Sequence, residues 1–390
     1  MPVGLLGLSR RLLWPLLLAL AAFGAACGPG ATPDALHVVT IDRQVDAILA
    51  RYIDRAIHHA EDSGARAVLL RIDTPGGPID AMREIVGRIE RSDVPIITYV
   101  TPPGAQAASA GTFIAMAGHV AAMAPNTTIG AATPISLTGD DLEGARGRKV
   151  MNDTVAFARG VAELRGRNAD WAEDAVRDAI SATPGEAVEL HVVDLVAETK
   201  EGALALAEGL DVTLLDGRTV QLRVTSAPRV ENGFNGYERV LSIVSDPLIV
   251  SLLLLIGLIG IATELFFAPG TFLPGTAGAI ALLLAFLGLG TLLPGEAALG
   301  LLALAVMLVV LELLTTTGGV LGAGAAIALA IALGIWVGSS GTDLGLVRVL
   351  TVLFGAIAVL TLLIGAFVGV LAVRYIAPTR KPDEPTPTEG

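Results

Sequence analysis

Apolar positions follow two contrasting patterns along the chain. From residue 35, short β-type runs alternate with stretches whose apolar residues recur at helical spacing. Such alternation is typical of βαβ units and predicts an α/β domain with a largely parallel sheet over residues 34–240. The predicted strands are 37–41, 67–72 and 95–100, and the predicted helices between them are 45–62 and 79–91.

From residue 248 the pattern changes to long, almost uncharged apolar stretches. About 20 apolar residues in a helix cross a hydrocarbon core of about 30 Å, and Pro and Gly turn formers separate these stretches. We therefore expect a transmembrane domain of about five helices over residues 248–373, followed by a disordered, Pro- and charge-rich tail over residues 374–390. The five predicted spans are 248–266, 275–293, 298–314, 319–338 and 349–372.

The N-terminus has the layout of a secretory signal peptide. Arg10 and Arg11 precede an apolar run that ends in small residues at Ala26. Residues 1–26 are thus a signal peptide or an uncleaved membrane anchor, and cleavage after Ala26 would expose Cys27 to lipid attachment. Either form places residues 34–240 on the extracytoplasmic side of the membrane. Five crossings then leave the basic tail inside, which agrees with the positive-inside tendency and predicts a multi-pass protein of the cell membrane with an extracytoplasmic domain.

Composition narrows the function. The 390 residues are 53% hydrophobic and 16% charged, which excludes a purely soluble protein. The net charge of −12 argues against a nucleic-acid partner. A single cysteine and five scattered histidines predict no metal site, and no cofactor motif is evident. Glu264 and Glu312 lie inside or near the ends of predicted spans, where they either line a proton or ion path or reach headgroup water.

Two motifs lie at predicted strand-to-helix junctions. One is Thr74-Pro75-Gly76-Gly77-Pro78, directly after a strand, and the other is the segment 104–111, which contains Ser109 and opens a helix. Ligands of open α/β sheets bind at the carboxyl ends of strands, and helix N-termini offer free N–H groups to developing negative charge. Ser109 is flanked only by Ala and Gly, so its hydroxyl is accessible enough to be a nucleophile.

A serine nucleophile needs a base, and no histidine is well placed by sequence. Lysine is the other candidate, because burial favours its neutral form. Only three of the 26 basic residues are lysines: Lys149, Lys200 and Lys381. Arginine cannot be deprotonated, so a position that must lose a proton has to stay lysine. Lys149 opens a helical segment after the loop that follows Ser109, whereas Lys200 lies in a charged turn. We interpret His119 and His191 as structural, and Asp73 and Asp153 as capping or local hydrogen-bonding groups.

The motifs together resemble the long-form NfeD family of membrane-bound serine proteases of the ClpP class. The segments that carry the resemblance are 74–77, 107–112, 124–132, 149–153 and 163–168. The resemblance implies a ClpP/crotonase-like spiral fold, with Ser109 as nucleophile and Lys149 as base. It also implies oxyanion N–H groups from Gly77 and Ala110.

Partners follow from the same resemblance: the lipid bilayer, a stomatin-family protein as substrate, and further copies of the chain in a homo-oligomer. Long-form members usually carry a soluble β-barrel after the last membrane helix, and here residues 374–390 stand in its place. Pro134 occupies the position where a ClpP-type protease would have its histidine, which supports a Ser-Lys pair.

Two other functions stay open. A coenzyme A-dependent crotonase-fold enzyme would share the Gly-Gly turn, but it needs neither a serine nucleophile nor export. A non-catalytic membrane scaffold would keep the fold without needing Ser109.

Overall fold

The computed structural model describes residues 32–135, 144–267, 273–290, 294–315 and 320–340. The chain divides into two compact units, Met1–Arg239 and Val240–Gly390. The predicted signal peptide, the fifth predicted span and the predicted tail lie outside the described residues.

The first unit is built on a six-stranded sheet of order β11-β1-β2-β3-β5-β8. Every neighbouring pair in this sheet is parallel, which confirms the predicted α/β class. The strands are β1 (Leu36–Ile41), β2 (Ala67–Ile72), β3 (Ile96–Val100), β5 (Val120–Met123), β8 (Leu195–Val196) and β11 (Arg229–Glu231).

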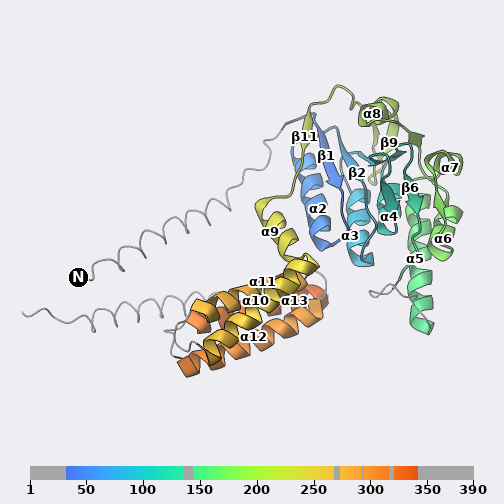
Figure 1. The fold of residues 1–390 in the computed structure, drawn as a ribbon. Helices are drawn as coiled ribbons and strands as arrows, with labels where there is room; N and C mark the ends of the chain where they lie inside the picture. Colours follow the sequence, from blue (N-terminus) through green and yellow to red (C-terminus); the bar gives the residue numbers. More distant parts are fainter. Residues whose placement is uncertain (1–31, 136–143, 268–272, 291–293, 316–319, 341–390) are drawn as a thin grey trace, which may run out of the picture. The chain divides into compact units, whose positions relative to one another are not determined.

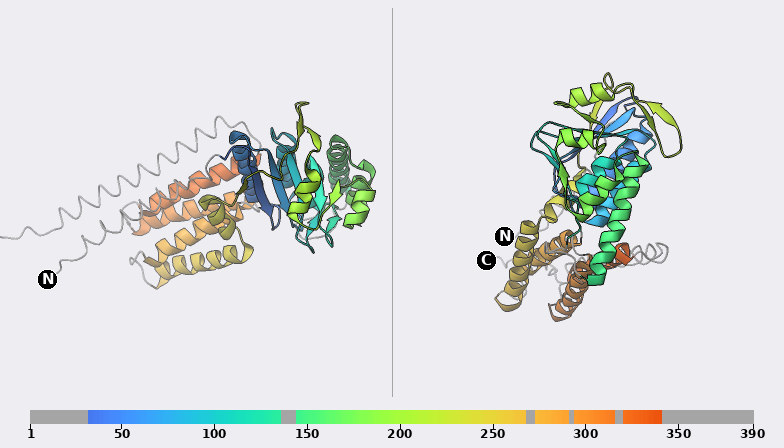
Figure 2. Two further views of the ribbon diagram at one scale, coloured as in Figure 1. Left: turned by 90° about the horizontal axis from the view of Figure 1, so that it is seen from above. Right: turned by 90° about the vertical axis from the view of Figure 1, so that its right-hand side faces the viewer.

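Successive residues of the central strands point to opposite faces, and both faces are buried. In β2, Val68 and Leu70 pack into one cluster with the helices α2 (Ala47–Asp62) and α3 (Ile79–Glu90). Leu69 of the same strand belongs to the cluster on the other face. Figures 1 and 2 show α2 and α3 running alongside the strands. The sheet is therefore the middle layer of three, as its nearly continuous apolar strands require.

The second face is covered by α8 (Lys200–Ala207) and by an antiparallel hairpin. The hairpin consists of β9 (Asp211–Thr213) and β10 (Thr219–Gln221). On the first face, α2 and α3 are joined by α4 (Ala110–Ala117), α5 (Gly144–Leu164) and α6 (Ala169–Arg177), which contribute buried residues to one cluster. The helix α7 (Pro184–Glu189) also belongs to the first unit, and α9 (Gly236–Val244) continues from the first unit into the second.

A small second sheet, which the sequence pattern did not predict, lies beside the nucleophile candidate. It has the order β4-β6-β7, with β4 (Gln106–Ala108) parallel to β6 (Thr128–Gly130) and β7 (Ser181–Ala182) antiparallel to β6. Because β4 ends one residue before Ser109 and α4 begins one residue after it, Ser109 lies at a sharp strand-to-helix junction.

The second unit contains four helices in the described residues: α10 (Pro247–Phe266), α11 (Leu273–Leu289), α12 (Pro294–Thr315) and α13 (Val320–Ser340). They coincide closely with the first four predicted spans. By length and apolar composition, Pro247–Glu264 of α10 is the one described segment that could cross a membrane alone. The apolar parts of the other three are shorter, at 274–289, 297–310 and 324–336. The five-span topology stays a prediction.

Two glutamates join consecutive helices of this unit. The N–H of Gly275, at the start of α11, donates to Glu264 Oε2 of α10 over 3.4 Å. The N–H groups of Leu321 and Gly322, at the start of α13, donate to Glu312 Oε2 of α12 over 3.0 and 3.2 Å. Each carboxylate therefore caps the N-terminus of the following helix, where the free N–H groups and the helix dipole favour negative charge. Neither sequence interpretation of these residues included this role.

Candidate active site

Ser109 adopts a backbone conformation that non-glycine residues rarely take. Its φ is 52° and its ψ is −118°. A residue in such a region costs on the order of 1–3 kcal/mol and persists only where its surroundings hold it. Here the Ser109 N–H donates to the carbonyl of Gly130 in β6 over 3.0 Å, and its carbonyl accepts from the N–H of Thr112 over 3.0 Å. The main chain on both sides of the side chain is thus fixed.

The side chain of Thr112 also holds the backbone around Ser109 in place, and the sequence analysis did not identify it. Its hydroxyl is fully buried and lies 2.9 Å from each of two carbonyl oxygens, those of Ala107 and Gly130. The same oxygen accepts the N–H of Gly130 over 3.1 Å. This one side chain therefore ties the first turn of α4 to both β4 and β6. Its position one helical turn after the serine was the only available signal in the sequence.

The Gly-Gly turn lies directly against Ser109. Gly76 has a φ of 105°, and a Cβ on it would lie 2.5 Å from the Cβ and 2.9 Å from the Oγ of Ser109. A Cβ on Gly77 would lie 1.9 Å from the carbonyl oxygen of Val45. Both positions therefore exclude a side chain. The turn is held to β4 by Thr74, whose N–H donates to the Gln106 carbonyl over 2.7 Å.

Only some of the N–H groups around Ser109 are free to meet a substrate. The N–H of Gly76 donates to Thr74 Oγ1 over 3.1 Å, and that of Ser109 is bound to Gly130. In the described part of the chain, the N–H groups of Gly77 and Ala110 have no recorded acceptor. Ala110 is the first residue of α4, where an N–H has no partner within the helix. Their assignment as oxyanion donors stays a prediction.

Lys149 differs from the buried base that the sequence analysis anticipated. It lies in the second turn of α5, because this helix begins at Gly144 and not at Lys149. Its side chain is exposed, and no hydrogen bond or ion pair with another described residue is recorded for it. The structure therefore shows no hydrogen bond between the side chains of Lys149 and Ser109. Their helices do pack together, with Phe113 of α4 stacked on Phe157 of α5 at 5.9 Å between ring centroids.

The remaining candidate residues have structural environments. His119 Nδ1 accepts the Ile96 N–H over 3.1 Å, and burial lowers the pKa of His119 to about 3, so the ring is neutral. His191 has a φ of 58° and accepts the N–H of Asn168 at its carbonyl over 3.0 Å. Asp73 accepts the Gln106 N–H over 3.2 Å, and Asp153 pairs with Arg83 over 2.7 Å. Lys200 begins α8 and lies 3.9 Å from Glu231.

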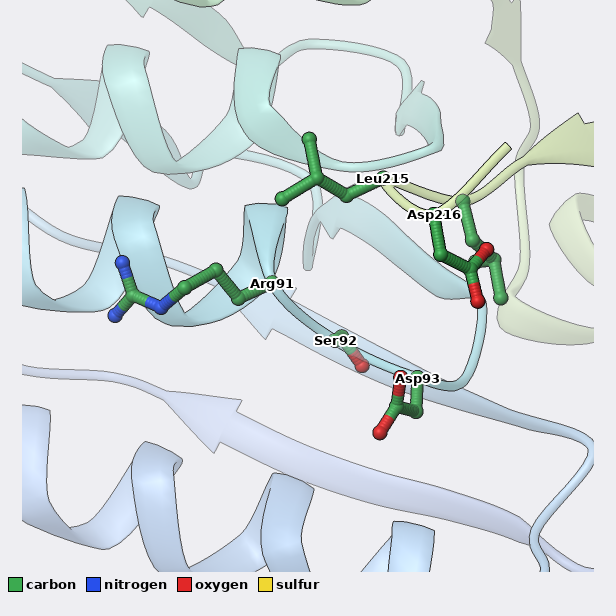
Figure 3. Close-up of a pocket in the computed structure, with 6 residues that line it drawn as sticks. Arg91, Ser92, Asp93, Leu215 and Asp216 are labelled. Carbon is green, nitrogen blue, oxygen red and sulfur yellow. The ribbon is translucent and has the colours of Figure 1, made fainter. Parts of the chain in front are cut away.

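A surface depression occurs elsewhere on this unit. It is lined by Arg91, Ser92, Asp93, Leu214, Leu215 and Asp216 (Figure 3). The segment 91–93 precedes β3, so it lies at the amino edge of the parallel sheet, whereas the Gly-Gly turn follows the carboxyl end of β2. The depression is therefore separate from the candidate site. Among the described residues, no group of three His, Cys, Asp or Glu side chains could hold a metal ion.

Known families match both units. Residues 35–209 match the NfeD1b N-terminal domain, and residues 248–373 match the NfeD integral membrane domain. The membrane-bound protease PH1510 of Pyrococcus horikoshii is 35% identical over 308 residues, covering 78% of this chain and 69% of the relative. Membrane protein NfeD1b of Bacillus subtilis is 29% identical over 328 residues, covering 83% of this chain and 72% of the relative.

A solved structure resembles the first unit. It is a lysine-to-alanine mutant of the 1510-N membrane-bound stomatin-specific protease in complex with a substrate peptide. The two sequences are 36% identical and the TM-score is 0.50. The match covers 54% of this chain and 97% of the chain in the solved structure. The α/β fold of this protease class and the protease activity expected from the sequence are thereby confirmed. The chain is a member of the NfeD family.

Proposed function

We propose that the protein is a membrane-anchored serine endopeptidase in which Ser109 is the nucleophile and Lys149 the general base. One observation carries the proposal: Ser109 is held at positive φ between the Gly76-Gly77 turn and the N-terminus of α4. Strained backbone of this kind concentrates at functional sites, because a merely structural serine gains nothing from it.

The geometry suits acyl transfer. Ser109 Oγ attacks the scissile carbonyl carbon and forms a C–O bond, while Lys149 accepts the hydroxyl proton and returns it to the leaving amine. The negative charge on the carbonyl oxygen is stabilised by the N–H groups of Gly77 and Ala110, the two that remain free beside Ser109. Water then hydrolyses the acyl-enzyme, and Lys149 again takes and returns the proton.

Two observations support Lys149 as the base. The chain uses arginine for almost all of its positive charge and keeps only three lysines. In addition, the solved complex of a related protease with a substrate peptide contains a lysine-to-alanine mutant of that protease. A lysine accepts a proton only in its neutral form, which burial favours. Because Lys149 is exposed in the single chain, we propose that a bound substrate or a second copy of the chain covers it.

The substrate class follows from the relatives and from the membrane unit. A related protease is stomatin-specific, and residues 248–373 of this chain match the NfeD integral membrane domain. We propose that apolar segments of membrane-associated proteins, such as stomatin-like C-termini, are cleaved by the domain 34–240. This domain lies outside the cell membrane, and the domain 248–373 holds it there with about five spans. Tethering raises the effective concentration of membrane-proximal segments.

The test uses full-length protein in detergent with casein and a stomatin-family C-terminal peptide. Ser109→Ala and Lys149→Ala are compared with Ser226→Ala and Lys200→Ala, which change the same residue types at positions outside the site. We expect cleavage to disappear in the first pair only. Cleavage retained by Ser109→Ala would refute the nucleophile, and cleavage retained by Lys149→Ala would refute the base. No cleavage by the parent protein would favour a scaffold.

A further inference from the structure

Three consecutive carbonyl groups at the end of α4 are bound by two arginines. The Nη1 of Arg167 donates to the carbonyls of Met116 and Gly118 over 2.8 and 3.0 Å. The Nε of Arg165 donates to the carbonyl of Ala117 between them over 2.7 Å. Helix C-terminal carbonyls lack partners within the helix, and cations are favourable there. Since α4 begins directly after Ser109, the arginines hold the opposite end of the nucleophile's helix.

Both arginines immediately follow α5, the helix that carries Lys149. The chain leaves α5 through Gly166 at a φ of 65°, and the N–H groups of Arg165 and Arg167 return to the Ala162 carbonyl over 3.2 and 2.8 Å. A glycine of this conformation after the last turn is a common helix termination. The backbone of both arginines is therefore fixed to α5, while their side chains are fixed to α4.

Asp194 attaches Arg167 to the central sheet. Its Oδ2 accepts from Arg167 Nη2 over 2.6 Å and from the N–H of Ala121 in β5 over 2.6 Å. The side chain of Arg167 is only 3% exposed. Burying a guanidinium is costly unless it is paired, so a charged group at this depth needs this set of partners. A hydrophobic side chain could fill the volume but could not bind the end of α4.

We propose that Arg167, assisted by Arg165, is a positioning residue that sets the placement of Ser109 relative to Lys149 by joining the C-terminal ends of their two helices. This inference rests on the proposed function of Ser109 and Lys149. The helix α4 has only eight residues, all buried, so a shift at its C-terminus is transmitted to its N-terminus. The planar fork of Arg167 binds two carbonyls and a carboxylate together, which the single ammonium of lysine cannot reproduce.

The test measures kcat and KM on an apolar peptide and the rate at which a fluorophosphonate labels Ser109, with full-length protein in detergent. Arg167→Lys and Arg167→Met should each lower kcat by on the order of 10²-fold, because small displacements of reacting groups cost rate. KM should change by less than about twofold, since the substrate-binding surface is untouched. Labelling should fall in parallel. Arg165→Met, which removes one recorded hydrogen bond, should have a smaller effect of the same kind.

Arg177→Met is the matched control, because Arg177 is exposed and pairs with Glu173 on its own helix. It should leave kcat, KM and labelling unchanged. Melting curves show whether each variant is folded at the assay temperature. If Arg167→Met does not fold, Arg167→Lys and Asp194→Asn, which keep the side-chain volume, give the answer instead.

A folded Arg167→Lys protein with unchanged kcat overturns the inference, as does a rise in KM alone or a loss of kcat that equals the loss of folded protein. The proposed function fails separately, if Ser109→Ala still cleaves while all arginines are present. If Ser109→Ala is inactive and Arg167→Lys fully active, only the positioning role is refuted.

Discussion

The two halves of the proposed active site differ in how firmly they are held. Around Ser109, backbone hydrogen bonds to Gly130 and Thr112 and the contact with Gly76 leave the nucleophile a single placement. Around Lys149, the side chain is exposed and has no recorded partner in the described part of the chain. Arg165, which follows α5 and lies 16 residues after Lys149, forms the hydrogen bond to the end of α4.

This difference shows which part of the chemistry is intrinsic to one chain. The fold alone fixes Ser109 and the free N–H groups beside it, so in the proposed mechanism this part of the site is in place before any substrate arrives. In the proposed mechanism, Lys149 becomes a base only when a bound substrate or a second copy of the chain covers it. An unoccupied single chain would then not cleave its neighbours.

The largest effect tests whether the halves act as one unit. Ser109→Ala and Lys149→Ala should each reduce kcat by on the order of 10⁴- to 10⁶-fold, and the double variant should be little worse than either. Single-turnover assays on the full chain measure all three. If the two losses multiplied, Ser109 and Lys149 would act independently and the pairing would be wrong.

Lys149→Arg tests the part of the proposed site around the exposed Lys149 without changing the surroundings of Ser109. Arginine keeps its proton, so this variant should be as inactive as Lys149→Ala although the positive charge is retained. The rate of peptide cleavage is the measurement, and Lys200→Arg serves as the control with normal activity. An active Lys149→Arg protein would mean that the residue supplies only charge.

Thr112→Val tests the part of the proposed site around Ser109, where the backbone is fixed by hydrogen bonds. Loss of the hydroxyl leaves the carbonyl of Ala107 and the N–H of Gly130 without this partner, so unfolding should become easier by about 1–3 kcal/mol. The kcat should fall as well, because Ser109 is released. Thr154→Val on α5 is the control, since its hydroxyl binds only the Val150 carbonyl of the same helix over 2.8 Å. Equal effects from both variants would remove the contrast between the halves.

The last effect concerns folding stability and its dependence on pH. Burial lowers the pKa of His37 to about 4 and that of His119 to about 3, against 6.5 in the unfolded chain. Below pH 6.5 the unfolded chain therefore binds protons that the folded chain does not. Stability should be greatest above pH 6.5 and decline towards pH 4, by up to about 1.4 kcal/mol per pH unit for each histidine.

Denaturant unfolding of the full chain at several pH values measures this decline. His119→Gln should make it shallower, because one of the two titrating groups is lost. A decline as steep in His119→Gln as in the parent protein would contradict the neutral, buried state of His119.

Local patterns were enough to predict the parallel sheet and the place of Ser109. The strands β1 to β3 are apolar over five or six residues, and the Gly-Gly turn and the small residues around Ser109 signal close approach by themselves. The strands β4, β6 and β7 have two or three residues, too few for an alternating pattern to be visible, so the second sheet was missed.

Features that depend on distant segments could not be read from the sequence. The segment 163–168 was recognised as part of a family pattern, but arginines are mostly exposed, and nothing local shows that Arg167 is buried against α4. The exposure of Lys149 was missed as well, because the burial of a side chain depends on segments that are distant in the sequence. Whether such a partner covers it stays a prediction.

The caps at Glu264 and Glu312 have a consequence for biogenesis. Lipid offers no partner to a backbone N–H, so a helix entering the bilayer must bring its own acceptors. Here each acceptor comes from the preceding helix, so α10 with α11, and α12 with α13, would enter the predicted five-span arrangement as two pairs that bring their own caps. In an alternating up-and-down arrangement both glutamates reach the same side of the membrane. A chain divided at residues 291–293 should still yield two halves that each insert when made separately.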